Sequence, residues 1–269
     1  MQTSRSVWHA QESDIIIITY FKTVRVVNKQ SNTYTIIFAS VLVIVVGLVL
    51  SLVYQALRPA QIENIANDTR KQILAAALIY PSAGEDLATV YNEHVKDSYI
   101  VNSKGEKVDT KEDAFSVNVA TEVKKPADER LLPVFECLTD NGMKYILPVY
   151  GAGLWGPIWG YVSIDSNGTE VYGAYFGHQG ETPGLGAEIE KTSFSNQFEG
   201  KHVINSEGQF FPIAVVKTGK EPADGNYVHA ISGGTITSSG VQAMLTSSLE
   251  PYTAFLDKLH SLNQTTDNK

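Results

Sequence analysis

An uncharged, apolar run near the N-terminus constrains this chain more than any other feature. Residues 36–57 contain no charged side chain, and the part from Ile36 to Leu50 is almost wholly apolar. As a helix, residues 36–57 would extend roughly 33 Å, enough to cross a hydrocarbon core of about 30 Å. A cleavable signal peptide would have a shorter apolar region ending in small residues. This run ends without such a site, so we interpret residues 34–57 as an uncleaved transmembrane helix.

Positive charges are distributed unequally around this predicted helix. Lys22, Arg25 and Lys29 precede it, whereas Arg58 alone follows closely. The positive-inside rule therefore predicts that residues 1–33 are cytoplasmic and that residues 58–269 lie on the other side of the membrane. In a bacterium with two membranes, this would place a single-pass protein in the inner membrane with its large domain in the periplasm.

The first 27 residues have a different character from the rest of the chain. They show no sustained hydrophobic period, and their apolar cluster Ile15–Ile18 is too short to span a bilayer. Our hypothesis is that residues up to about 27 do not belong to the native protein, with translation starting near Val26 or Val27.

Composition narrows the function of the large domain. At 269 residues, with 43% hydrophobic and 19% charged residues, the chain can form one main soluble domain with a sizeable core. A net charge of −8 argues against a nucleic-acid binder, which normally presents a basic face. The single cysteine, Cys137, excludes an intrachain disulfide or an iron–sulfur cluster built by this chain alone, and its apolar neighbours predict a core residue. The histidine spacing supports no metal site.

The pattern of apolar residues predicts an α+β fold. Helices are expected at Gln61–Ala77 and after residue 235, where Val241, Met244, Leu245 and Leu249 follow one helical face. A strand is expected at Tyr99–Val101, and the charged stretch from Val108 to Arg130 is expected to be a solvated loop or an insertion. Further strands are expected at residues 132–138, 144–150, 160–165 and 170–176, separated by Asn-Gly turns. This order predicts a twisted antiparallel sheet with flanking helices.

A glycine-rich loop with nearby tryptophans lies between two predicted strands. Residues 151–156 match the pattern G-x-G-x-x-G, but a strand rather than a helix follows, so we reject a dinucleotide site. Trp155 and Trp159 are expected either to pack in the core or to lie beside a planar ring.

A second glycine-containing segment combines hydroxyl side chains with a predicted helix start. It reads Ile231-Ser-Gly-Gly-Thr-Ile-Thr237-Ser238. Gly233 and Gly234 permit backbone torsions and close approaches that a Cβ would obstruct, and the positive end of the following helix favours an anion. The segment therefore predicts a phosphate site, with an ordinary Ser/Thr helix cap as the alternative.

The loop Phe176–Gly186 is the other candidate for ligand binding. Its glycines and Pro183 predict an ordered turn, in which Glu181 and Thr182 supply polar groups able to hydrogen-bond a heterocycle. His178 alone does not indicate a ligand site.

These two segments resemble the FMN-binding domain family, in which an approximate Ser-Gly-Ala-Thr-x-Thr motif carries FMN on its last threonine through a phosphoester bond. Ser232, Gly233 and Thr235 match the motif, Gly234 replaces its alanine, and Thr237 takes the flavin-bearing position. Residues 181–186 match a family loop that lines the flavin ring. The resemblance implies a cofactor region at about residues 140–250. The implied site residues are Thr237, Ser232, Gly233, Gly234, Thr235, Glu181, Thr182, Leu185, Gly186 and Trp155.

Both motifs behind one membrane helix resemble the C subunits of the sodium-translocating NADH:quinone reductases. The similarity extends from Asn28 to about Leu259. One alternative is the G subunits of the Rnf-type ferredoxin:NAD oxidoreductases, which are usually shorter and lack a region like residues 99–130. Another is a membrane-tethered module that binds a free phosphate-bearing ligand.

The resemblance to the C subunits implies a membrane-anchored flavoprotein that relays electrons through covalent FMN within a complex of six subunits. It implies a separate flavin transferase, using FAD, that loads Thr237. The chain would hold no catalytic residue and no complete site for NADH or quinone. Sodium transfer would belong to the assembled complex, because a single helix without ionisable residues offers no ion path.

Overall fold

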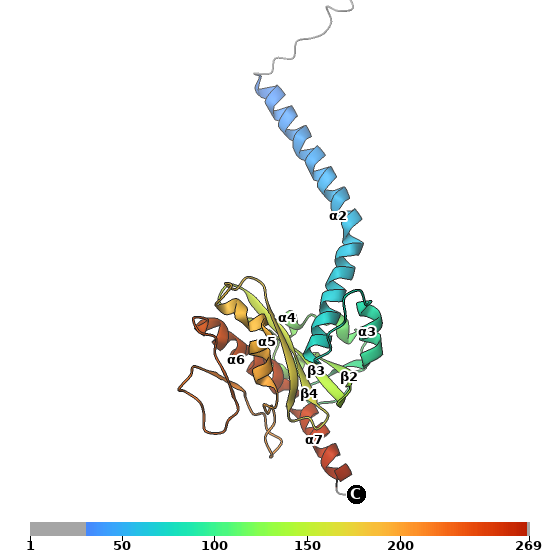
Figure 1. Cartoon of the computed structure of the whole chain (residues 1–269). Coiled ribbons are helices and arrows are strands. Elements are labelled where there is room, and N and C mark those ends of the chain that lie inside the picture. Colours follow the sequence, from blue (N-terminus) through green and yellow to red (C-terminus); the bar gives the residue numbers. More distant parts are fainter. Residues whose placement is uncertain (1–30, 268–269) are drawn as a thin grey trace, which may run out of the picture. The chain divides into compact units, whose positions relative to one another are not determined.

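A computed structural model describes residues 31–267, in which one long helix precedes a sheet-rich domain (Figure 1). The chain divides into two compact units, residues 1–63 and 64–269. The hypothesis about residues 1–27 lies outside the described residues.

Helix α2 (Asn32–Ala76) contains the predicted membrane segment and continues well beyond it. It is long and apolar enough to cross a membrane, judged by length and composition. The sequence predicted two helices separated near Pro59, whereas the structure has one helix with Pro59 inside it. Pro59 cannot donate the usual hydrogen bond to the carbonyl of Gln55, but its fixed φ is compatible with helical geometry. Only the last turns of α2 carry fully buried side chains.

The remaining elements follow in a simple order along the chain. The longer ones are α3 (Leu87–His94), β1 (Val95–Val101), β2 (Leu132–Thr139), β3 (Gly142–Ala152), β4 (Pro157–Asp165), β5 (Val171–His178), α6 (Thr235–Leu249) and α7 (Thr253–Asp267). The shorter ones are η1 (Ala114–Ser116), α4 (Val119–Glu122), η2 (Ala127–Glu129), η3 (Gly186–Glu190), α5 (Thr192–Ser195), η4 (Asn196–Phe198), β6 (Ala214–Val216), β7 (Tyr227–His229) and η5 (Glu250–Tyr252).

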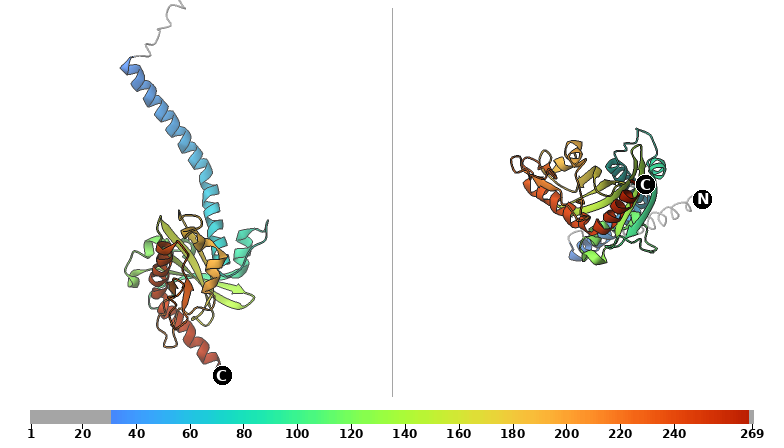
Figure 2. Two further views of the ribbon diagram at one scale, coloured as in Figure 1. Left: turned by 60° about the vertical axis from the view of Figure 1, so that its left-hand side comes forward. Right: turned by 90° about the horizontal axis from the view of Figure 1, so that it is seen from below.

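Strands β1 to β5 form one antiparallel sheet in sequence order, so each strand pairs with the next. The predicted strands are all present, and the tight connections fall at the Asn-Gly pairs, where Gly142 (φ +88°) and Gly168 (φ +73°) adopt positive φ. A small parallel pair, β6 and β7, completes the sheet structure among residues 31–267. The α+β prediction with an antiparallel sheet and flanking helices is confirmed (Figure 2).

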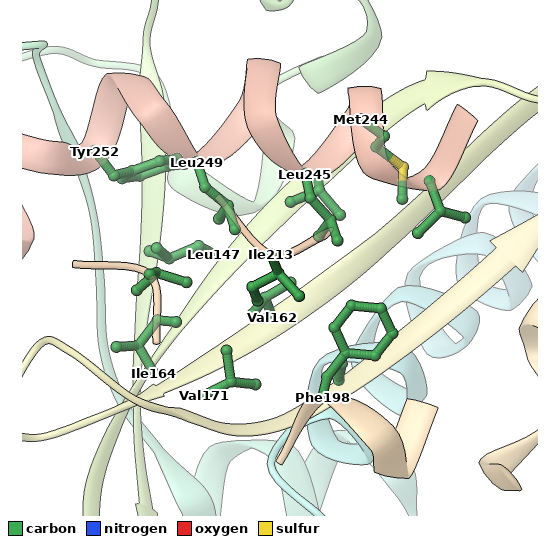
Figure 3. Close-up of a cluster of buried hydrophobic side chains, with 14 of the residues drawn as sticks. Leu147, Val162, Ile164, Val171, Phe198, Ile213, Met244, Leu245, Leu249 and Tyr252 are labelled. Atoms are coloured by element: carbon green, nitrogen blue, oxygen red, sulfur yellow. The ribbon is translucent and has the colours of Figure 1, made fainter. Parts of the chain in front are cut away.

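Both faces of the sheet are covered. On β2 and β3, Val134 and Leu147 belong to one buried cluster, while their neighbours Phe135 and Ile146 belong to another. This alternation follows from the two-residue period of a strand. Figure 3 shows the first cluster, where Met244, Leu245 and Leu249 of α6 face residues of the sheet. The second cluster is closed by Ile73 and Ala76 at the end of α2, together with residues of the region before β2.

The region from Val108 to Arg130 is more ordered than the sequence suggested. It contains η1, α4 and η2, and buries Ala114 and Val117 against the sheet. Even Glu122 is buried, because its carboxylate accepts hydrogen bonds from Lys125 Nζ and from the Leu131 N–H. The expectation of a solvated loop was wrong. Charged residues outnumber apolar ones in this region, so the composition did not reveal the few apolar side chains that hold it against the sheet.

Cys137 lies in the sheet and is fully buried, as predicted for a core residue. Burial raises the pKa of its thiol to about 11. At neutral pH the thiol is therefore protonated, which fits a packing role rather than a reactive one.

Candidate functional site

A pocket of about 360 Å³ lies where three loops of the sheet-rich domain meet. It is lined by Leu154, Trp155, Glu181, Thr182, Leu185, Gly186, Gly233, Gly234, Thr235, Ile236 and Thr237. These residues come from the β3–β4 connection, from the loop between β5 and η3, and from the start of α6. The first two segments are brought together by the β4–β5 hairpin, and α6 packs against β3.

The structure brings together every predicted site residue except Ser232, which is exposed and does not line the pocket. Sequence reasoning missed Leu154 and Ile236, which also line it. Both are large apolar side chains that stay about half exposed. Their only signal in the sequence is an apolar residue placed beside polar and glycine positions, a pattern too common to single them out.

The start of α6 is built by the backbone rather than by a side-chain cap. Gly234 occupies the N-cap position, and no side chain caps the helix there. The preceding turn is held from inside the helix, because Ser238 Oγ accepts a hydrogen bond of 3.0 Å from the Ile231 N–H. The alternative of an ordinary Ser/Thr cap is therefore wrong. Thr235 and Thr237 lie in the first helical turn, where backbone N–H groups lack intrahelical partners.

Glycine is required in the turn that precedes α6. Gly233 has φ +75°, a left-handed conformation that side chains with a Cβ rarely adopt. A Cβ there would also lie 2.6 Å from Leu185 Cδ2. The close approach of Leu185 to this turn joins the two motif segments into one wall of the pocket.

A buried hydrogen bond connects the two motifs at the floor of the pocket. Thr237 Oγ1 donates to Glu181 Oε2 at 2.6 Å, and the two residues are only 2% and 4% exposed. The other carboxylate oxygen, Oε1, accepts from the Trp155 N–H at 2.8 Å. The N–H of Glu181 donates to His178 Nδ1 at 3.1 Å, so the loop also fixes the backbone of Glu181.

Two glycines make room for this carboxylate. A Cβ on Gly186 would collide with Glu181 Oε2 and with Thr237 Oγ1, and a Cβ on Gly153 would collide with Glu181 Oε1. Gly186 was predicted as a site residue, whereas Gly153 was seen only as part of a loop motif. The carboxylate therefore occupies space that only glycine leaves open at both positions, and its two oxygens are held by the hydrogen bonds with Thr237 and Trp155.

The rim of the pocket is apolar and exposed. Trp155 is 68% exposed and Leu185 is 42% exposed. Core burial of Trp155 is therefore excluded, and its side chain is free to lie against a planar ligand. Trp159 behaves differently: it is half-buried, and its Nε1 donates to Gln72 Oε1 at 3.2 Å.

Across residues 31–267, no group of three or more His, Cys, Asp or Glu side chains is placed to hold a metal ion. The pocket lining, within the same part of the chain, includes no lysine or arginine. An anion bound there would rely on backbone N–H groups, hydroxyls and the helix N-terminus.

Comparison with known proteins connects this pocket to a family. Residues 153–250 match the model of the FMN-binding domain family. The C subunit of the Na(+)-translocating NADH-quinone reductase of Pasteurella multocida is 31% identical over 238 residues, which cover 80% of this chain and 88% of that protein. The chain belongs to the family formed by the C subunits of Na(+)-translocating NADH-quinone reductases.

Other members of this family agree with the assignment. The Yersinia pestis protein is 45% identical over 100 residues, or 37% of each chain. The crystal structure of the family member from Parabacteroides distasonis superposes with a TM-score of 0.68 at 50% identity, covering 74% of this chain and 96% of that one. The Shewanella oneidensis NqrC structure shares the fold, with a TM-score of 0.61 at 24% identity over 73% of this chain and 98% of that one.

Proposed function

We propose that this chain is the membrane-anchored flavoprotein subunit of a sodium-translocating NADH:quinone reductase complex, with FMN attached covalently to Thr237. The observation that carries the proposal is the position of Thr237, whose hydroxyl lies at the floor of a pocket inside the segment matched to the FMN-binding domain family. The relatives are named as subunits of such a reductase, which supports the presence of partner subunits.

The residues of the pocket fit FMN. Its volume, about 360 Å³, lies in the range typical of cofactor sites. Apolar side chains at the rim, above all Trp155 and Leu185, suit an isoalloxazine ring, while Gly233, Gly234 and Thr235 offer backbone and hydroxyl groups to a phosphate. We expect Thr182 to bind near the polar edge of the ring. When bound, the flavin supplies one- and two-electron redox chemistry.

The protein's own contribution is attachment and positioning. A phosphoester on Thr237 would prevent loss of the cofactor and leave the ring free at the rim. The first turn of α6, which carries Thr237, is fixed because α6 packs on the sheet. The cofactor would therefore keep a constant distance to its electron donor and acceptor. We propose a flavin transferase, with FAD as donor, as the partner that loads the site.

The apolar part of α2 supports an anchor in the inner membrane at about residues 34–57. We propose that residues 58–269 lie in the periplasm, with the flavin region at about residues 140–250. This topology rests on the excess of Lys and Arg before the helix. Five other subunits, together with this one, would provide the sites for NADH, quinone and sodium.

Thr237→Ala tests the attachment site. With flavin transferase present, the variant should insert in the membrane and fold normally but carry no covalent flavin, because the acceptor oxygen is gone. The measurements are flavin fluorescence in a denaturing gel and mass spectrometry of the peptide that contains residue 237.

Ser239→Ala is the matched control. It removes an exposed hydroxyl two residues later, outside the pocket lining, and leaves the acceptor in place, so this variant should still carry covalent flavin. Covalent flavin on Thr237→Ala, at Thr235 or elsewhere, would refute the proposed site. A wild-type chain that loses its flavin on denaturation would instead favour a site for a free phosphate-bearing ligand.

A further inference from the structure

The hydroxyl of Thr237 already has a proton acceptor. A threonine hydroxyl is a weak nucleophile at neutral pH and needs a base to become reactive. No such base stands near residue 237 in the sequence, but the fold places the Glu181 carboxylate 2.6 Å from Oγ1, across 56 residues of chain. A candidate general base must lie within about 2.6–3.2 Å of the group whose proton it removes, and Glu181 meets this requirement.

The carboxylate is held in the orientation that this role requires. Its Oε1 is engaged by the Trp155 N–H, which leaves Oε2 to receive the proton of Thr237. Gly153 and Gly186 leave room for the two oxygens, because a Cβ at either position would collide with the carboxylate. A buried carboxylate that served only to stabilise the fold would be satisfied equally well by any hydrogen-bond donor. Here its partner is the one residue that the family motif marks as the acceptor.

We propose that Glu181 is the general base for covalent attachment of the flavin, so that this chain, and not the transferase alone, activates its own acceptor. The inference rests on the proposed function of Thr237. The co-reactant is a flavin dinucleotide with a pyrophosphate linkage. Thr237 Oγ1 forms a bond to the flavin-side phosphorus, the bridging phosphorus–oxygen bond breaks, and the nucleoside monophosphate leaves with the bond's electron pair. The proton of Thr237 passes to Glu181 Oε2.

The charges after transfer are consistent with this assignment. A protonated Glu181 can donate a hydrogen bond to the new phosphodiester, whereas an ionised carboxylate would repel it at close range. No lysine or arginine among the described residues lines the pocket to offset two negative charges. The other titratable groups nearby are His178, whose Nδ1 accepts from the Glu181 N–H, and Glu190, 3.7 Å from His178 Nε2.

Glu181→Gln tests the proposal in the full-length chain. The apo protein, purified in detergent, is mixed with flavin transferase and FAD, and covalent flavin is followed over time by fluorescence in denaturing gels. Loss of a general base typically costs a factor of about 100 or more. We expect kcat for attachment to fall by about that factor, with little change in the KM for the apo chain.

Glu188→Gln is the matched control. It makes the same chemical change seven residues away, at a carboxylate that accepts from the Gly184 N–H rather than from Thr237. Its attachment rate should equal that of the wild type. Thermal unfolding of each apo variant separates slow chemistry from a damaged fold.

A folded Glu181→Gln variant that is loaded at the wild-type rate would overturn the proposal. If that variant does not fold, Glu181→Asp decides, because it keeps the carboxylate but withdraws it by one methylene group. A lowered kcat with unchanged KM supports the base, and wild-type kcat refutes it. Failure of the proposed function is distinct, since the wild-type chain itself would then carry no flavin on Thr237.

Discussion

Two polar contacts in this domain each involve a fully buried polar side chain but have different surroundings. One joins Lys144 and Asp165, which face each other on β3 and β4, with Nζ 2.7 Å from Oδ1. The other joins Thr237 and Glu181. Lys144 is only 2% exposed, and its ammonium also donates to the Asn141 carbonyl at 2.6 Å and lies over the Tyr172 ring.

The difference lies in what is beside each contact. Among the described residues, the partners of Lys144 all lie at the ends of the β2–β3 and β4–β5 hairpins, so the contact only joins structural elements. Thr237 and Glu181 instead form the floor of a pocket, and glycines at 153 and 186 keep the space around them clear. Burial of a polar pair is therefore weak evidence of function by itself. Burial beside a cavity, next to glycine positions where a Cβ would not fit, is stronger evidence of function.

The largest effect that separates the two contacts is expected from Gly186→Ala. The new Cβ would collide with both partners of the Thr237–Glu181 hydrogen bond. We expect covalent flavin attachment to slow by a factor on the order of ten or more, because the carboxylate and the hydroxyl must move apart. The rate is measured by flavin fluorescence in denaturing gels.

Gly180→Ala is the matched control for this variant. Gly180 lies on the same loop, and a Cβ there would meet no atom of the described residues within 4 Å. This variant should load flavin normally. Equal rates for the two alanine variants would mean that the packing around Glu181 has no part in attachment.

Lys144→Met should lower the stability of the fold without slowing flavin attachment. Methionine retains much of the apolar volume but cannot make the two charge-assisted hydrogen bonds. We therefore expect the free energy of unfolding to fall by about 2 kcal/mol in total. The side chain of Asp165 is 34% exposed and stays hydrated, so the loss should not reach the larger cost of stranding a fully buried charge. Urea unfolding of the apo chain measures the change. Flavin attachment should be unaffected; a slower attachment rate would show that the two contacts are coupled.

The sheet was predictable because its signals are local. Strands β2 to β5 have apolar runs bounded by Asn-Gly turns, and each pairs with its neighbour in the sequence. Errors arose where the structure depends on non-local packing. Residues 108–130 read as solvated from their charge, but a few apolar side chains hold them on the sheet. The helix that passes through Pro59 was divided for a related reason, because the uncharged run and the apolar pattern after it were interpreted as two separate helices.

The candidate site was predictable as two separate motifs and not as one pocket. Resemblance to a family indicated Thr237 and Glu181, but not that their side chains touch. That contact depends on the hairpin β4–β5, which carries residue 181 to the start of α6 over 56 residues. Ser232 illustrates the converse, because it matches the motif yet stays outside the pocket. A motif match identifies a segment, whereas the register of the fold determines which of its side chains face the site.

The smallest expected effect is at Ser163, whose side chain is buried without a polar partner. It lies on β4 and is 0% exposed, and its Oγ has no hydrogen-bond partner among residues 31–267. An unsatisfied buried hydroxyl costs free energy, so Ser163→Ala should stabilise the apo chain by about 1 kcal/mol.

Ser248→Ala is its matched control and completes the comparison of buried polar groups. Ser248 is also buried, but its Oγ accepts from the Tyr150 N–H at 3.2 Å and donates to the Tyr150 carbonyl at 3.3 Å. Alanine there would leave a backbone N–H and a carbonyl without these bonds, and should destabilise the chain by about 1 kcal/mol. The two variants lose the same atom, so opposite signs in urea unfolding isolate the value of the partner. Destabilisation by Ser163→Ala would mean that its hydroxyl is satisfied in solution, as by a buried water molecule.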